Sequence, residues 1–141
     1  MSTPETAVKA KIKAALKQRN VYFFMPATHG YGSSGVPDIV GLWNKLFIGV
    51  EVKAGRGKPT TLQIKNLRQI RDGGGAAILV DETGIGMFTL LLDTWASRGP
   101  QFGVFYNMTK HVIDIDQIEA DCWHGAQTQA HPTRQVCNVS Q

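Results

Sequence analysis

The fold is decided by two adjoining stretches of the sequence, GVPDIVGLW at residues 35–43 and LFIGVEVK at residues 46–53. Both are nearly unbroken apolar runs rich in β-branched residues, which is typical of strands buried on both faces of a sheet. Only Asn44 and Lys45 separate the two runs. The sequence therefore predicts a tight hairpin, although Asn-Lys is a weaker turn signal than Asn-Gly.

A two-residue turn fixes which residues face each other across the hairpin. Trp43 then pairs with Leu46, and the same register places Asp38 directly opposite Glu51. The β-carbons of paired residues lie about 5 Å apart, so two negative charges there repel each other. Burial raises the cost of such a pair further. Lys53 follows two residues after Glu51 and shares its face. The pattern therefore predicts two carboxylates and an ammonium at one end of the strand pair, an arrangement that needs a counter-charge, which a divalent metal ion supplies.

Each half of this pattern also has a plain structural explanation. The sequence E-x-K at a strand end is commonly a solvated ion pair, and Pro37-Asp38 by itself is typical of a turn. The metal-site hypothesis depends on the pairing of the two halves rather than on either one.

The bulk composition indicates one ordinary globular domain. The chain has 141 residues, enough for one core but not for two, of which 43% are hydrophobic and 18% charged. The net charge of +4 is compatible with a polyanionic partner. No apolar run reaches the length of a membrane span, and residues 1–5 lack a signal-peptide pattern. With only two cysteines, we expect a cytoplasmic protein with free thiols and no membrane partner.

Residues 4–19 predict the first helix, with Pro4 in its first turn and Ser2 or Thr3 as the N-cap. Its apolar stripe consists of Val8, Ile12 and Leu16. The lysines of this helix mostly point away from that stripe, and they are Lys9, Lys11, Lys13 and Lys17.

Glu5 is a candidate site residue because it stands three residues before Val8 and so shares the stripe that faces the core. The alternative is a capping box, Ser2-x-x-Glu5, since acids favour helix N-termini. Both interpretations remain open from the sequence.

A short aromatic strand at residues 21–25 is followed by a glycine-rich loop over residues 27–35. The loop contains G-x-G-x-x-G, but a dinucleotide-binding fingerprint must run straight into a helix. Here Pro37 and a strand follow instead, which excludes that fingerprint. The glycines favour a mobile loop that approaches a phosphate backbone closely.

The loop at residues 54–59 carries Arg56 and Lys58 directly after the predicted carboxylates. It lacks the glycine and the hydroxyl residue that a Walker A loop needs. Cations at this place suit a nucleic-acid backbone, and the alternative is a solvated basic loop.

Residues 60–72 predict the second helix, whose polar side carries Lys65 and Arg68 as further candidate DNA-binding residues. Gln63 has two compatible explanations. It completes a capping box with Thr60, and it reaches back toward the metal site.

The remaining elements follow in order. Residues 76–80 predict a buried strand, parallel to its neighbour, and residues 88–97 a third helix, with a strand over 86–92 as the competing prediction. Residues 101–106 predict an added strand and residues 112–122 a short helix. We therefore expect a core over residues 1–98 and an extension of the same domain, ending in a polar tail, over residues 99–141. The potential zinc ligands of this extension lack the usual paired spacing, and they are Cys122, His124, His131 and Cys137.

The ordered set of motifs resembles a VRR-NUC domain, a branch of the PD-(D/E)xK nuclease superfamily. The resemblance covers about residues 4–97. It is carried by Glu5 on the opening helix, GVPD at residues 35–38, EVK at residues 51–53, and Gln63. It implies an α/β fold with a restriction-endonuclease-like αβββαβ core, in which helices flank a central mixed β-sheet.

The resemblance also implies roles for individual residues. Asp38 and Glu51 would be metal ligands together with the backbone carbonyl of Val52, and Lys53 would orient or activate the attacking water. Glu5 and Gln63 would assist from their helices. All-oxygen ligation favours Mg²⁺ or Mn²⁺ over zinc.

Stand-alone members of this family come from viruses and bacteria and act as homodimers on branched DNA. The resemblance therefore implies a structure-selective DNA endonuclease acting on substrates such as Holliday junctions, in a bacterial or virus-infected cell. Two alternatives stay open. One is a non-catalytic nucleic-acid-binding module with the same fold, and the other is a zinc protein organised by its C-terminal residues.

Overall fold

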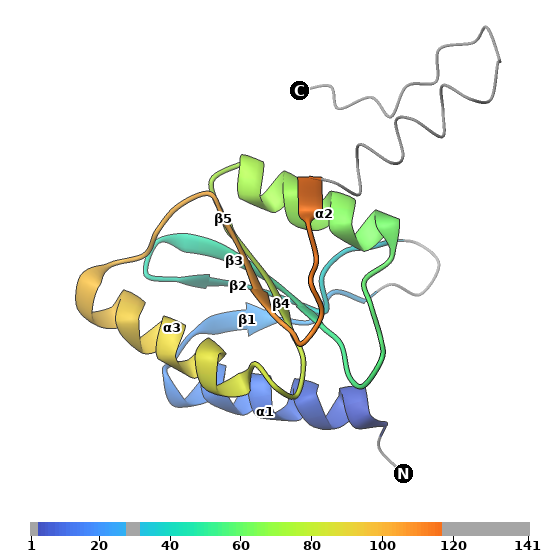
Figure 1. The fold of residues 1–141 in the computed structure, drawn as a ribbon. Helices are drawn as coiled ribbons and strands as arrows, with labels where there is room; N and C mark the ends of the chain where they lie inside the picture. Colours follow the sequence, from blue (N-terminus) through green and yellow to red (C-terminus); the bar gives the residue numbers. More distant parts are fainter. Residues whose placement is uncertain (1–2, 28–31, 117–141) are drawn as a thin grey trace, which may run out of the picture.

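The computed structural model describes residues 3–27 and 32–116, and its elements follow the αβββαβ order that the sequence predicts (Figure 1). In chain order the elements are α1 (Pro4–Gln18), β1 (Tyr22–Phe24), β2 (Ile39–Trp43), β3 (Leu46–Val52), α2 (Thr61–Asp72), β4 (Ala76–Val80), α3 (Ile85–Arg98) and β5 (Val104–Met108).

The strands form one mixed sheet in the order β1-β2-β3-β4-β5. The first three are antiparallel neighbours, and β3, β4 and β5 run parallel to one another. Helix α2 connects β3 to β4 and α3 connects β4 to β5, as parallel neighbours require. The chain therefore has an α/β fold with a mixed sheet flanked by helices, compatible with a restriction-endonuclease-like core.

The β2–β3 hairpin closes through the two-residue turn that the sequence predicts. Asn44 and Lys45 both have positive φ angles, 51° and 71°, as in the type I′ turns that match the twist of paired strands. Trp43 pairs with Leu46, which confirms the predicted register. The Asn44 amide also donates a 3.0 Å hydrogen bond to the carbonyl oxygen of Trp95, which ties the turn to α3.

The helices cover the two faces of the sheet unequally. Helices α1 and α3 lie side by side on one face, and α2 covers the other (Figure 1). The larger core lies under α1 and α3, where the buried helix residues are Val8, Ile12, Ala15, Leu16, Phe88, Leu92 and Trp95. The smaller core lies under α2 and is centred on Ile64 and Leu67.

The prediction that both hairpin strands are buried on both faces is wrong at one end. Leu42 is 53% exposed and Phe47 is 47% exposed, and both lie on the face that α2 covers elsewhere. The reason is that α2 packs mainly on β3, β4 and β5, so it leaves β1 and the far end of β2 uncovered. Next to the site, by contrast, β3 is buried from Ile48 to Val52.

Other boundaries differ by a few residues. Helix α3 begins at Ile85, which excludes the competing strand over residues 86–92. Strand β5 spans Val104–Met108 and pairs with β4, so part of the predicted extension belongs to the sheet. The predicted helix over 112–122 lies mostly outside the described residues, as does the tail.

Within residues 3–27 and 32–116, no helix has both the length and the apolar character needed to cross a membrane.

Candidate active site

The predicted site residues gather where β2 begins and β3 ends. Asp38 directly precedes β2, Glu51 is in the last part of β3, and Lys53 follows that strand. The antiparallel ladder ends with Ile39 opposite Val50, so Asp38 and Glu51 are the next residues outward along the two chains.

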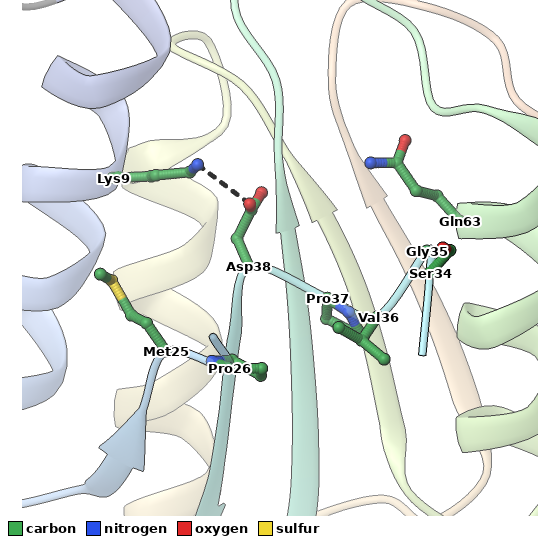
Figure 2. A pocket seen from close by; sticks show the side chains of 9 residues that line it. All are labelled: Lys9, Met25, Pro26, Ser34, Gly35, Val36, Pro37, Asp38 and Gln63. Atoms are coloured by element: carbon green, nitrogen blue, oxygen red, sulfur yellow. Dashed lines mark ion pairs between the residues drawn. The ribbon is translucent and has the colours of Figure 1, made fainter. Parts of the chain in front are cut away.

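The Asp38 carboxylate connects the strand end to helix α1. Its Oδ2 accepts a 2.9 Å hydrogen bond from the backbone N–H of Val52. Its Oδ1 lies 2.9 Å from Nζ of Lys9, a contact visible in Figure 2. The two oxygens of one carboxylate therefore face different partners.

The backbone at Val52 is oriented as the predicted carbonyl ligand requires. Its N–H points to Asp38, whereas the N–H of Lys53 bonds to the carbonyl oxygen of Val80 on the opposite neighbour at 2.9 Å. In an extended strand, the N–H and C=O of one residue point to the same neighbour. The Val52 carbonyl is therefore directed toward the Asp38 side.

Glu51 is the buried acid of the site, with only 1% of its surface exposed. The pKa of its carboxyl is raised to about 7, chiefly by burial and then by the charge of Asp38, while the charge and hydrogen bond of Lys53 act in the opposite direction. The ammonium of Lys53 lies 3.1 Å from Oε1 of Glu51. One ammonium does not offset both burial and the neighbouring carboxylate, so this strand end favours additional positive charge.

Glu5 faces the site from the first turn of α1. The N-cap is Thr3, whose hydroxyl accepts a 3.2 Å hydrogen bond from Thr6 N. A capping box between Ser2 and Glu5 would start the helix one residue earlier, so that alternative is wrong. The charge of Glu5 contributes to the raised pKa of Glu51, which places Glu5 within electrostatic reach of the predicted ligands.

Lys9 is a site residue that the sequence analysis missed. Its ammonium lies between two acids, 2.9 Å from Asp38 Oδ1 and 3.2 Å from Glu5 Oε1. Burial lowers the pKa of Lys9, but its hydrogen bonds and charge interactions with Asp38 and Glu5 outweigh this effect and hold the pKa above its usual value. The signal available in the sequence was its i,i+4 spacing from Glu5.

Gln63 has the capping role that the sequence predicts, and its side chain also lies beside Asp38. The side-chain Oε1 of Gln63 accepts a 2.9 Å hydrogen bond from the backbone N–H of Thr60, and the backbone N–H of Gln63 donates to the Thr60 hydroxyl at 3.2 Å. This capping box starts α2. The side chain also lines the pocket beside Asp38, and its amide nitrogen points toward the Asp38 side (Figure 2).

A pocket of about 460 Å³ opens beside Asp38. It runs between α1 and the start of α2, and its lining residues are Lys9, Met25, Pro26, Ser34, Gly35, Val36, Pro37, Asp38 and Gln63 (Figure 2). Gly35 is required for this shape, because its φ is +77° and a β-carbon there would lie 2.7 Å from Cγ of Leu62. This glycine thus serves close packing against α2; residues 28–31 of the same loop lie outside the described part of the chain.

The four predicted DNA-binding cations are not equally accessible. Arg56, Lys58 and Lys65 are exposed. Arg68 instead turns toward Asp116, with Nε 3.7 Å from Oδ1, and only 20% of its side chain is exposed. The loop that carries Arg56 is anchored by 3.2 Å hydrogen bonds from Gly55 N to the Glu82 carboxylate.

The donor set fits a hard divalent cation. Within the described residues no group of three or more His, Cys, Asp or Glu side chains is placed to hold a metal ion. A metal ion bound by Asp38 and Glu51 would therefore take the Val52 carbonyl oxygen and water as its further ligands. Such oxygen donors suit Mg²⁺ or Mn²⁺, and Mg²⁺ commonly retains several waters. The Lys9 ammonium already forms an ion pair with Oδ1 of Asp38. The four potential zinc ligands of the extension lie outside the described residues.

Comparisons with protein-family models, with curated proteins and with solved structures gave no match.

Proposed function

We propose that this protein is a metal-dependent, structure-selective DNA endonuclease that hydrolyses phosphodiester bonds with Mg²⁺ or Mn²⁺. The observation that carries the proposal is the hairpin register, which ends with Ile39 opposite Val50 so that Asp38 and Glu51 come next on the two chains, together with the Lys53 ammonium 3.1 Å from Glu51. Burying a charged acid costs free energy. Two acids and an ammonium beside a pocket are groups that phosphodiester hydrolysis can use.

A divalent ion held at this strand end supplies Lewis acidity and offsets negative charge on the scissile phosphate. The Val52 N–H holds one oxygen of the Asp38 carboxylate in place. Glu51 accepts a hydrogen bond from Lys53, which holds that ammonium close to where negative charge develops during attack. Positive charge fixed in advance at such a place stabilises the transition state.

Gln63 contributes from the opposite wall of the pocket. Its Oε1 is fixed by the helix cap, so the amide group has a defined orientation, and an N–H donor aimed at the pocket can bind a phosphate oxygen.

Exposed basic side chains support a nucleic-acid substrate. The exposed cations Arg56, Lys58 and Lys65 follow the site in sequence, and cations of this kind bind phosphates without reading sequence. The preference for branched DNA such as Holliday junctions, and the action as a homodimer, are taken from the resemblance to VRR-NUC domains.

The test is a cleavage panel. The full chain is incubated with end-labelled four-way junction, flap, duplex and single-stranded DNA, in Mn²⁺, in Mg²⁺ and in excess chelator. We expect cleavage with either ion and none with chelator, and faster cleavage of the branched substrates. Binding of DNA without cleavage under any of these conditions would instead identify a non-catalytic binding module.

A further inference from the structure

The two oxygens of Asp38 are differently engaged. Oδ2 is held by the Val52 N–H, and Oδ1 is 2.9 Å from the Lys9 ammonium. A metal ion that binds Asp38 therefore meets an oxygen that already has a cation beside it. A Mg²⁺–oxygen bond is about 2.0–2.1 Å long, so an ammonium that stayed in place would lie close to the ion and would repel it.

A second acid gives that ammonium an alternative partner. Oε1 of Glu5 lies 3.2 Å from Nζ of Lys9, and both residues project from α1 one turn apart. Lys9 can therefore release Asp38 and keep an ion pair. The lysine lines the pocket and 27% of its side chain is exposed, which leaves room for that movement (Figure 2).

We propose that Lys9 is an internal counter-cation that competes with the divalent ion for Asp38, and that Glu5 acts by holding the displaced Lys9. This inference rests on the proposed function, because it concerns the same metal site. It assigns Lys9 as a positioning residue that sets metal affinity. It also changes the role of Glu5, which then acts on the metal through Lys9.

The competition is measured without DNA or catalysis. Mn²⁺ binding to the full-length protein is followed by calorimetry and by the electron paramagnetic resonance signal of free Mn²⁺. Lys9→Met removes the competing charge, and we expect its affinity for Mn²⁺ to rise about tenfold or more, within the usual range for coupled sites. Lys9→Arg keeps the charge and should bind Mn²⁺ much as the unmodified chain does.

Two controls separate this mechanism from a general charge effect. Lys11→Met removes the same charge from an exposed position on α1 and should change the affinity less than twofold. Circular dichroism and melting curves confirm that each variant is folded. An equal gain from Lys11→Met, or no gain from folded Lys9→Met, would overturn the proposal.

A double substitution tests the role of Glu5. If Glu5 acts through Lys9, Glu5→Gln weakens Mn²⁺ binding strongly in the presence of Lys9, but in the Lys9→Met background only the small effect of its distant charge is left. A direct ligand would weaken binding by the same factor in both backgrounds, and that result would refute the assigned role of Glu5. Asp38→Ala serves as the reference: if it binds Mn²⁺ as tightly as the unmodified chain, the metal site itself is misplaced and the proposed function fails instead.

Discussion

At the scale of single residues, the site is an electrostatic arrangement that is complete only with an added cation. Glu51 is buried and has its pKa raised to about 7, first by burial and then by Asp38. The Lys53 ammonium lies 3.1 Å from Glu51, and the Lys9 ammonium lies 2.9 Å from Asp38, so each offsets the charge of one acid. These contacts offset part of the negative charge, and they leave the strand end short of positive charge.

The ionisation of Glu51 predicts how stability depends on pH. Its pKa rises from 4.5 to about 7 on folding, so between these values the folded state binds more protons than the unfolded state. Stability from this group is then fully present below pH 4.5 and is lost as the pH rises through 7. A shift of this size corresponds to about 3–4 kcal/mol at most.

Glu51→Gln should therefore stabilise the metal-free protein at pH 8 by several °C in melting temperature and by much less at pH 5. The measurement is thermal unfolding in chelator at both pH values. A Glu51→Gln variant that is equally stabilised, or destabilised, at both would show that Glu51 does not carry this ionisation cost.

The sequence predicted most of the site but not Lys9. Asp38, Glu51 and Lys53 follow from strand alternation and a two-residue turn. Lys9 does not, because helical periodicity only places it next to the apolar stripe. Which side of that stripe meets Asp38 depends on how α1 crosses the end of the sheet, and that is set by packing against α3.

At the scale of elements, the hairpin turn governs the site because its register decides which side chains face each other. Asn44 and Lys45 have φ angles of 51° and 71°, a conformation that costs free energy for a lysine and none for a glycine. The hydrogen bond from the Asn44 side-chain amide to the Trp95 carbonyl oxygen keeps the turn in place despite this cost.

Lys45→Gly should therefore raise the free energy of unfolding by about 1 kcal/mol, since it produces the preferred Asn-Gly type I′ turn. Lys17→Gly is the matched control, because it puts a glycine in the last turn of α1, where it should destabilise by about 0.5–1 kcal/mol. Urea unfolding measures both. Equal losses in the two variants would argue against the type I′ geometry.

The start of α2 gives a second element-scale prediction. Thr60→Ala removes the acceptor of the Gln63 N–H and should cost about 1 kcal/mol of stability. Thr61→Ala, one residue later and exposed, should cost little. Loss of the Thr60 hydroxyl loosens the helix start and with it the Thr60 backbone N–H that holds Gln63 Oε1, so Thr60→Ala should slow DNA cleavage at saturating Mn²⁺ more than Thr61→Ala does. Equal rates for the two variants would count against a role of the cap in the site.

At the scale of the whole molecule, the sheet is covered by two helices on one face and by one on the other (Figure 1). The apolar runs of the hairpin predicted burial on both faces, but periodicity does not say how many strands a single helix covers. The exposure of Leu42 and Phe47 is the consequence. Element order, the mixed sheet and the hairpin register could be predicted, because each follows from local turns and crossover rules.

The distribution of cations predicts how DNA binding depends on salt. Arg56 and Lys58 are exposed next to the site, so Arg56→Ala or Lys58→Ala should weaken DNA binding and reduce the slope of log K against log [salt] by about 1 each. Arg68→Met should leave that slope nearly unchanged, because Arg68 turns toward Asp116. Fluorescence anisotropy at several salt concentrations checks this. A full unit of slope lost in Arg68→Met would mean that its side chain reaches DNA.

The central claim is that Asp38 and Glu51 act together on one divalent ion to cleave DNA. The most direct measurement is single-turnover cleavage of a labelled four-way junction in Mn²⁺ by the unmodified chain, Asp38→Ala and Glu51→Ala, with DNA binding measured in parallel. We predict that both variants bind the junction and that neither cleaves it above the chelator background. Cleavage by folded, highly purified Glu51→Ala at the rate of the unmodified chain would contradict it.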